Sequence, residues 1–302
     1  MSLSTPARSA AHAVAILRRP RGRTAKERAF QSVLFLATIV GVVVLGALLV
    51  EVLRDGAGRL EWRFLTNYTS RFADRTGILA GLTGTLSLMA ITALLSFPIG
   101  VGAAIYLEEF APDNRFTRLM QVNIANLAGV PSVVYGLLAA GIFVYLLGFG
   151  GALISGAMAL TLLILPVLIV AAREAIRAVP SSIREAGLAL GATPWQVTSR
   201  QVMPVAMPGI LTGTILALSR AIGEAAPILV AGAVFSRRAT SEPWRILEAF
   251  AALPVQIFDF ARRPQQAFQV EVAAAAILVL LGALLVMNTV AIVLRNRYMG
   301  RW

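Results

Sequence analysis

The feature that most constrains this chain is a run of 54 residues, Leu119 to Ala172, that contains no Asp, Glu, Lys or Arg. A membrane-spanning helix needs ~20 mostly apolar residues. The run is therefore long enough for two crossings, joined at the glycine-rich segment Gly148 to Gly156. Only 14% of the 302 residues are charged, against ~25% in soluble domains. The pattern predicts an integral membrane protein.

Four further uncharged or nearly uncharged runs are long enough to cross a bilayer. They are Ala29–Val50, Thr76–Leu107, Met207–Phe235 and Val272–Leu294. We therefore expect an all-α integral membrane protein with six transmembrane helices, formed by residues 29–302 after a basic tail at residues 1–28. The first run exceeds the ~7–15 apolar residues of a signal-peptide core, so it is interpreted as a retained helix.

The distribution of basic residues predicts the orientation. Six spans place both termini on one side, and the segments on that side hold 16 of the 27 Lys and Arg residues, against 10 on the other. Cytoplasmic segments of membrane proteins are enriched in Lys and Arg, so both termini are expected in the cytoplasm. The basic residues flank spans instead of forming one patch with interleaved aromatics, which argues against nucleic-acid binding.

Two charges interrupt the fifth apolar run, at Arg220 and Glu224. Four residues apart, they are expected on one helix face, one turn from each other. Each costs ~2.5–3.5 kcal/mol at the bilayer centre, so they must face protein or water. A buried ion pair that fixes helix packing is one interpretation. Because such pairs are poor net stabilisers, a substrate pathway is the favoured one.

An arginine beside a carboxylate suits a particular class of substrate. Arginine donates two parallel hydrogen bonds to an oxyanion, whereas an ionised carboxylate only accepts. The pair therefore tolerates an anion that still carries a proton, as phosphate does near neutral pH and sulfate does not. Sulfate, molybdate and phosphonate remain alternatives.

The long polar segment between spans four and five, residues 173–206, contains helix-start and helix-stop signals in quick succession. Ser181 or Ser182 is expected to cap a first helix, and Gly191 to end it in the left-handed conformation. Thr193 followed by Pro194 starts a second short helix. The segment therefore predicts a cytoplasmic helix-turn-helix finger.

The run EAGLALGATPWQVTSRQVMP within this segment resembles the EAA loop of ABC importer permeases. Glu185, Ala186, Gly191 and Pro204 match the pattern, whereas Gly187, Gln201 and Met203 stand where the family has alanine, an aliphatic residue and leucine. The resemblance implies that the four matching residues couple the chain to a separate ATP-hydrolysing subunit.

The runs ALSRAIGEAAP, GVPSVVYGLL, LPVLIVAAREAIRAVP and LPVQIFDFARRPQQAFQ extend the likeness over all six spans. They resemble PstA-type permeases of phosphate ABC importers. This implies a prokaryotic inner-membrane subunit in which Arg220 and Glu224 serve phosphate passage. It also implies three kinds of partner: a PstC-like second permease, two copies of a PstB-like ATPase and a PstS-like phosphate-binding protein.

No ATPase site of its own is expected in this chain. A P-loop needs Lys followed by Ser or Thr, and the only lysine, Lys26, precedes Glu27. ATP and Mg²⁺ are therefore assigned to the partner ATPase, with no cofactor on this chain. With no cysteine and a single histidine, His12, no metal site is expected. An ion-coupled secondary transporter, which would also have midplane charges, is the alternative from another class.

Two residues near Pro131 are further pathway candidates. Pro131 breaks the helical ladder of span three. The hydroxyl of Ser132 can therefore hydrogen-bond to backbone groups that lose their helical partners, or it can line a cavity. Tyr135, one turn on, offers a hydroxyl to an anion or to a neighbouring helix. For both residues, packing is as good an explanation as a pathway role.

Charged residues outside the spans receive simpler interpretations. Glu108 and Glu109 are expected on a solvated cytoplasmic turn. The outer loop at residues 236–269 is long and rich in aromatics, and long loops are uncommon without a purpose. Four of its arginines are expected to dock the binding protein or attract the anion: Arg237, Arg238, Arg262 and Arg263.

Overall fold

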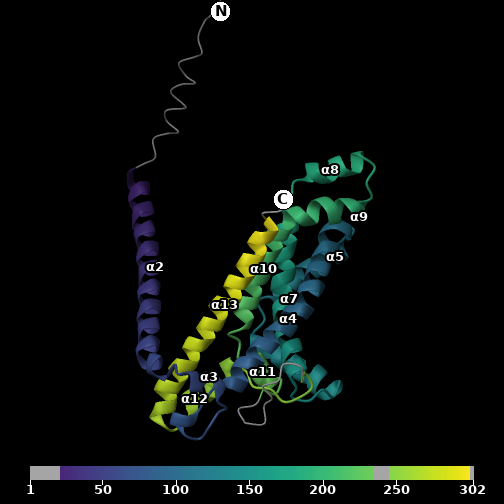
Figure 1. The fold of residues 1–302 in the computed structure, drawn as a ribbon. Coiled ribbons are helices and arrows are strands. Elements are labelled where there is room, and N and C mark those ends of the chain that lie inside the picture. Colours follow the sequence, from purple (N-terminus) through teal and green to yellow (C-terminus); the bar gives the residue numbers. More distant parts are fainter. Residues whose placement is uncertain (1–20, 234–244, 300–302) are drawn as a thin grey trace, which may run out of the picture. The chain divides into compact units, whose positions relative to one another are not determined.

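The computed structural model describes residues 21–233 and 245–299 (Figure 1). Over these residues the chain is helical and contains no strand. It divides into two compact units, residues 1–52 and 53–302, which are described separately.

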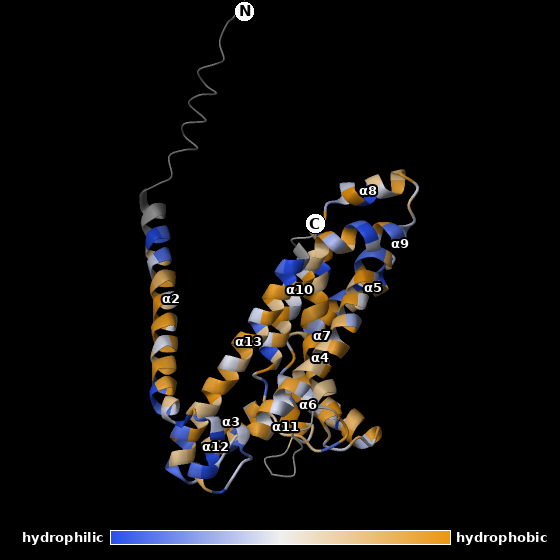
Figure 2. Ribbon diagram, in the orientation of Figure 1, coloured by the Kyte–Doolittle hydropathy of each residue, from blue (hydrophilic) through white to orange (hydrophobic). Residues whose placement is uncertain are grey.

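The first unit contains most of one long helix, α2 (Arg21–Gly56). Every residue from Lys26 to Val50 is exposed, although most of this stretch is apolar (Figure 2). A helix that is apolar all round belongs in a bilayer or a protein interior. The predicted first span, Ala29–Val50, lies inside this helix.

The second unit contains the other helices, several of which continue without a break into a short 3₁₀ or π turn. In chain order they are α3 (Trp62–Thr66), α4 (Leu79–Ile105) with η3 (Tyr106–Phe110), α5 (Arg115–Leu127), α6 (Ser132–Ala139) with η4 (Ala140–Leu146), α7 (Leu153–Arg177), α8 (Ser181–Ala189), α9 (Pro194–Val197) with η5 (Thr198–Val202), α10 (Met203–Ala221), α11 (Ala226–Val230), α12 (Leu253–Arg262), η6 (Phe268–Val272) and α13 (Ala273–Met299).

Helix α7 forms the centre of this unit, between α4 and α10. A methyl group added at Gly213 of α10 would lie 2.5 Å from the Cβ of Ala171, and one added at Gly209 would lie 2.8 Å from that of Ala175. Small residues at this spacing allow helix backbones to approach closely. The two glycines therefore set the distance between α10 and α7.

Five helices are long and apolar enough to cross a membrane, and the bent pair α5 and α6–η4 makes a sixth span if counted as one. This agrees with the predicted all-α, six-span architecture, but the third span is not straight. Its two helices meet at 106° across the break at residues 128–131. Pro131, the N-cap of α6, has no amide hydrogen and cannot continue the ladder of α5.

The fifth span also differs from the prediction. The apolar helix runs from Pro194 to Ala221, so the second helix of the predicted finger is not a separate short element. It continues through η5 into α10 as 28 residues, a length of about 40 Å at 1.5 Å per residue. The finger and the fifth span are therefore one rod.

The two ends of the second unit are polar and the middle is apolar (Figure 2). One end, called the finger end here, carries α8, α9 and the C-terminal turns of α13; the opposite end carries α3 and α12 (Figure 1). The distribution matches a bundle that crosses a bilayer between two aqueous phases.

Candidate functional site

Arg220 lies in the last turn of α10, and Glu224 lies beyond the end of that helix. The prediction that both stand on one helix face is therefore wrong. Pro227 has no amide hydrogen to donate to the carbonyl of Gly223, and its ring would clash with that carbonyl in a continuous helix. The chain breaks at residues 222–225 and resumes as α11.

The break still leaves the two charges paired. The Nε atom of Arg220 lies 3.5 Å from Oε1 of Glu224, with side-chain exposures of 49% and 20%. Within the described residues, the Arg220 guanidinium makes no hydrogen bond. An arginine has five N–H donors, so the guanidinium of Arg220 retains donor capacity.

Tyr135 lies near the same place but its hydroxyl is engaged. It is 6% exposed and donates a hydrogen bond of 2.7 Å to the carbonyl of Leu127, the last residue of α5. Its ring packs in the same buried cluster as Ala217 and Ala221 of α10, the helix that carries Arg220. Tyr135 therefore holds the break between α5 and α6 beside the arginine.

The structure gives Ser132 no comparable contact. It occupies the first turn of α6, half-buried, and its hydroxyl has no hydrogen-bond partner in the described part of the chain. Helix α6 packs closely on α11: a methyl group at Gly136 would lie 2.8 Å from the Cα of Pro227. The two short helices that follow the two breaks thus lie side by side.

The finger forms largely as the sequence predicts. Gly191 has φ +83°, the left-handed conformation that ends α8. Thr193 and Gln196 form a reciprocal capping box at the start of α9, with Pro194 in the first turn. The predicted serine cap is wrong: α8 begins after Pro180, with no side-chain cap hydrogen bond. Ser181 is already its first helical residue.

Three of the four residues predicted to couple the chain to an ATPase are exposed: Glu185, Ala186 and Gly191, whereas Pro204 is half-buried. Glu185 and Ala186 are exposed, with Leu190 beside them 87% exposed. Pro204 follows a π turn in which the amide of Met203 donates to the carbonyl of Thr198. A proline cannot continue the ladder, and a π turn relieves that strain inside a helix.

Two departures from the EAA pattern touch each other. A methyl group added at Gly187 would lie 2.6 Å from Oε1 of Gln201 and 2.8 Å from Cγ2 of Val197. The glycine therefore makes room for the longer glutamine side chain on the facing helix. Gly187 and Gln201 thus fit together where α8 meets η5.

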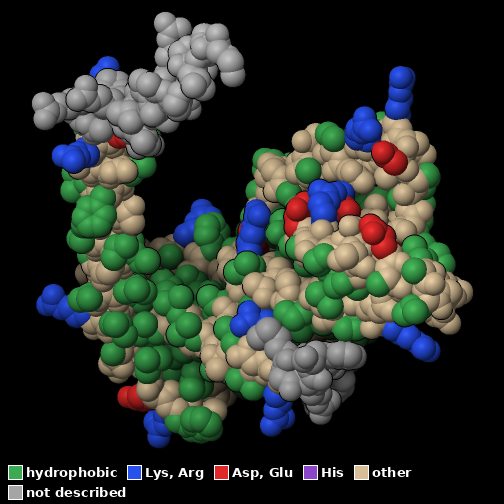
Figure 3. All heavy atoms as spheres, turned by 90° about the horizontal axis from the view of Figure 1, so that it is seen from above, with side chains coloured by type: hydrophobic (Ala, Val, Ile, Leu, Met, Phe, Trp, Pro, Cys, Tyr) green, Lys and Arg blue, Asp and Glu red, His purple; other side chains and the backbone are tan. Residues whose placement is uncertain are grey.

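The prediction for Glu108 and Glu109 is wrong, because neither side chain is solvated. Their side-chain exposures are 12% and 8%, and both pair with arginines: Glu108 with Arg173 and Arg177, Glu109 with Arg184. Seen from above, acidic and basic side chains lie interleaved around the finger end (Figure 3). One signal was available in the sequence: two acidic residues follow one span, and arginines follow another span assigned to the same side.

The arginines expected at the opposite end have different roles. Arg263 pairs with Asp259 at 2.7 Å, donates to the carbonyl of Ser70 at 3.0 Å and stacks on two phenylalanine rings. Arg262 is exposed and, within the described residues, stacks on Phe258 alone. Arg237 and Arg238 lie outside the described residues. Arg263 is thus a structural residue, and Arg262 stays a candidate for docking.

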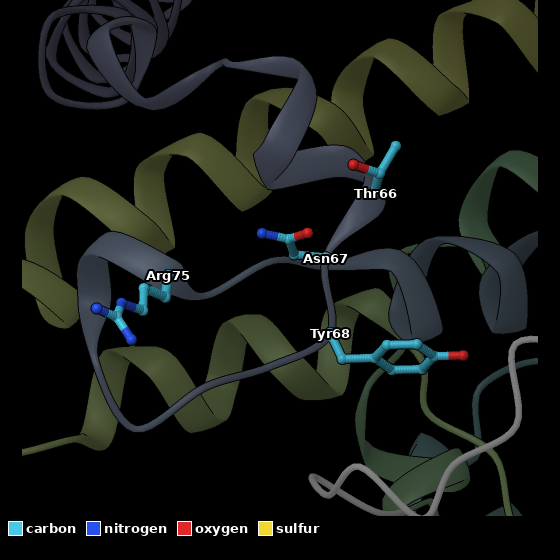
Figure 4. A pocket seen from close by; sticks show the side chains of 4 residues that line it. All are labelled: Thr66, Asn67, Tyr68 and Arg75. Carbon is cyan, nitrogen blue, oxygen red and sulfur yellow. The ribbon is translucent and has the colours of Figure 1, made fainter.

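An open pocket of about 500 Å³ lies in the loop between α3 and α4. It is lined by Thr66, Asn67, Tyr68 and Arg75 (Figure 4). Arg220 and Glu224 are not among its lining residues. The pocket is therefore distinct from the paired charges.

Comparisons with known proteins identify the architecture. Residues 96–298 match the family described as binding-protein-dependent transport system inner membrane component. The chain is 34% identical over 236 residues to the probable ABC transporter permease protein YqgI of Bacillus subtilis, covering 78% of each chain. It is 32% identical over 231 residues to the phosphate transport system permease protein PstA of Haemophilus influenzae, covering 76% of this chain and 80% of that one.

A solved structure shows the same fold at low identity. It is a bacterial ABC transporter involved in the import of the acidic polysaccharide alginate, with a TM-score of 0.62 and 15% identity over 92% of this chain and 99% of that one. The segment that matches the family, residues 96–298, includes η3, both breaks and the finger. The chain therefore belongs to the family of binding-protein-dependent transport system inner membrane components, the multi-pass permease subunits of ABC importers.

Proposed function

We propose that this chain is the permease subunit of an ATP-driven importer of inorganic phosphate. The observation that carries the proposal is Arg220: its guanidinium faces one carboxylate at 3.5 Å and makes no hydrogen bond in the described chain. The relatives named for phosphate transport support the choice of anion. Family membership also removes the ion-coupled carrier as an alternative.

The pair is suited to brief, loose binding. Arg220 donates hydrogen bonds to the oxyanion, and Glu224 accepts a hydrogen bond from the hydroxyl group that a singly or doubly charged phosphate still carries. Sulfate and molybdate have no such proton near neutral pH. A binding protein upstream performs the first selection, and Arg220 favours passage of the released anion.

Membership of the family implies partner subunits: a second permease, an ATPase and a binding protein. We assign these to a PstC-like permease, two PstB-like ATPase copies and a PstS-like phosphate-binding protein. The finger end faces the cytoplasm, where Glu185, Ala186 and Leu190 dock the ATPase. We assign both termini to the cytoplasm as well, from the distribution of Lys and Arg. The basic tail at residues 1–28 precedes the permease domain at residues 29–302.

The proposed mechanism is alternating access. Closure of the ATPase pair pulls the fingers of the two permeases together. Because α9 and α10 form one continuous helix, movement of the finger reaches Arg220 directly. The pathway opens outward, the anion meets Arg220, and reopening of the ATPases releases it inward.

The test is uptake of labelled phosphate by vesicles containing the assembled complex, with and without ATP, competed by arsenate and sulfate. We expect uptake that requires ATP, yields to arsenate and ignores sulfate. Arg220→Ala should lower uptake by about 10- to 150-fold, the range for losing a hydrogen bond to a charged group. Arg220→Lys should recover part of it, because lysine keeps the charge but not the two parallel donors.

Arg118→Ala is the matched control, because this arginine is 73% exposed and pairs only with Asp113 at 3.6 Å. It should leave uptake unchanged. ATP-dependent uptake of sulfate instead of phosphate would overturn the choice of anion. Normal phosphate uptake by Arg220→Ala would remove the assigned role of the arginine.

A further inference from the structure

Three consecutive residues of the η3 turn contact three different elements at the finger end. Glu108 pairs with α7, Glu109 with α8, and the ring of Phe110 lies 6.3 Å from that of Trp195 on α9. Since η3 continues α4 directly, all three contacts end on the same helix. One turn therefore connects α4 with both helices of the finger and with the helix that leads into it.

The backbone of η3 explains how neighbouring residues reach in different directions. The amide of Ala111 donates to the carbonyl of Tyr106 at 2.7 Å, closing a π turn. Such turns widen the helix locally and occur frequently at functional sites. The widened turn directs Glu108 and Glu109 inward to different partners, where both are largely buried.

On the finger, the contact depends on Arg184. This arginine donates to Glu109 at 2.7 Å through Nη2 and at 3.1 Å through Nε. It also donates to the carbonyls of Val179 and Ile176 at 2.8 and 3.0 Å, which lie at or just beyond the end of α7. Among the described residues, no other side chain of α8 makes a hydrogen bond or ion pair. Arg184 is thus the polar link between α8 and the spanning helices.

Arg184 and Glu185 are neighbours in sequence, but their side chains point in different directions. Glu185, the next residue, is exposed, whereas Arg184 points into the bundle with 25% of its side chain exposed. A force applied to the exposed face of α8 is therefore delivered one residue away, through a charged pair, to α4. A buried ion pair is weak evidence for stability, and a role in transmission accounts for its presence.

We propose that η3 is the joint that carries movement of the finger into α4, with Glu109 and Arg184 as its positioning pair. The inference rests on the proposed function as an ATP-coupled permease. The finger already reaches α10 through a continuous helix. The joint adds α4 on the other side of α7, so that both neighbours of the central helix move with the finger.

The test measures how much phosphate enters per ATP hydrolysed in the reconstituted complex. Glu109→Gln keeps the size of the side chain and removes its charge. We expect the ratio to fall by about 2- to 30-fold, the effect of coupling changes of ~0.5–2 kcal/mol, while ATPase binding and basal ATP hydrolysis stay unchanged. Arg184→Gln should lower the ratio too, and the double variant should lose no more than the worse single variant.

Glu174→Gln is the matched control. Glu174 pairs with Arg177 at 3.4 Å on the surface of one helix, with side-chain exposures of 64% and 54%, so the pair links no two elements. Glu174→Gln should therefore keep the wild-type ratio of phosphate taken up to ATP hydrolysed. If Glu109→Gln fails to assemble, Glu109→Asp keeps the charge and withdraws the carboxylate from Arg184; it should show an intermediate ratio.

The outcomes separate the two proposals. Absence of ATP-dependent phosphate uptake by the wild-type complex would refute the proposed function. Uptake by the wild type, with the same phosphate-to-ATP ratio in Glu109→Gln or in an assembled Glu109→Asp, would refute the joint. Additive losses in the double variant would show that Glu109 and Arg184 act separately, which also refutes it.

Discussion

Replacing Tyr135 by phenylalanine tests whether this residue contacts the anion or holds the break in the third span. The substitution removes one hydroxyl, whose 2.7 Å bond to the carbonyl of Leu127 is lost. That carbonyl keeps a second bond, from the amide of Val130 at 3.0 Å, so it is not left unpaired. The cost is therefore the net value of one hydrogen bond, about 1 kcal/mol.

The substrate side of this prediction follows from the same bond. The hydroxyl proton is already donated to Leu127, and the oxygen lone pairs that remain cannot bind an anion. Tyr135→Phe should therefore leave the apparent KM for phosphate unchanged. The assay combines thermal unfolding of the purified complex with uptake at several phosphate concentrations.

Tyr145→Phe serves as the control, because Tyr145 is 79% exposed and has no hydrogen bond within the described chain. It should change neither stability nor uptake. A several-fold rise in KM for Tyr135→Phe, with stability equal to that of Tyr145→Phe, would refute the reasoning and assign the hydroxyl to the substrate.

Three further predictions concern packing. Gly213→Ala places a methyl group 2.5 Å from the Cβ of Ala171. It should destabilise the complex by about 1–3 kcal/mol in thermal or denaturant unfolding. Gly102→Ala is the control and should not destabilise it, because no atom lies within 4 Å of the added methyl group. Gly187→Ala should weaken copurification of the ATPase by displacing α8 from Gln201 and Val197, and Gln201→Ala should restore part of it. Arg263→Ala should lower stability by about 1–3 kcal/mol through loss of its partly buried hydrogen bonds to Asp259 and Ser70, while leaving affinity for the binding protein unchanged. Arg262→Ala should not lower stability.

The features predicted correctly from the sequence depend on neighbours close in the chain. The left-handed Gly191 and the helix start at Thr193 and Pro194 each involve residues within one helical turn. The positions of the first, second and sixth spans also follow from apolar composition, which is read within one short stretch of chain. These signals are complete in a short window, so a single sequence suffices to interpret them.

The features that were wrong depend on distant partners or on competing local signals. Glu108 and Glu109 were expected in solvent because their arginine partners lie 65 and 75 residues away. The end of α10 was missed because the apolar run continues past Gly223, although Pro227 ends the hydrogen-bond ladder there. Apolar composition predicts burial in the bilayer, and it does not show where a helix stops.

The two breaks in the spanning helices, at residues 128–131 and 222–225, suggest how movement of the finger reaches Arg220 and Glu224. Gly209 and Gly213 allow α10 to pack closely on α7. The η3 turn joins α4 to α7 through Glu108 and to α8 through Glu109. We therefore expect these elements to move as one body. Packed interfaces of this kind switch between discrete arrangements instead of deforming continuously. The continuous helical ladder ends at residues 128–131 and 222–225, where mostly short turn hydrogen bonds remain, so these segments are the expected places to bend. Arg220 and Glu224 stand at the second break. In the mechanism proposed above, a movement that starts at the finger changes the distance between them and thereby the strength with which they hold an anion.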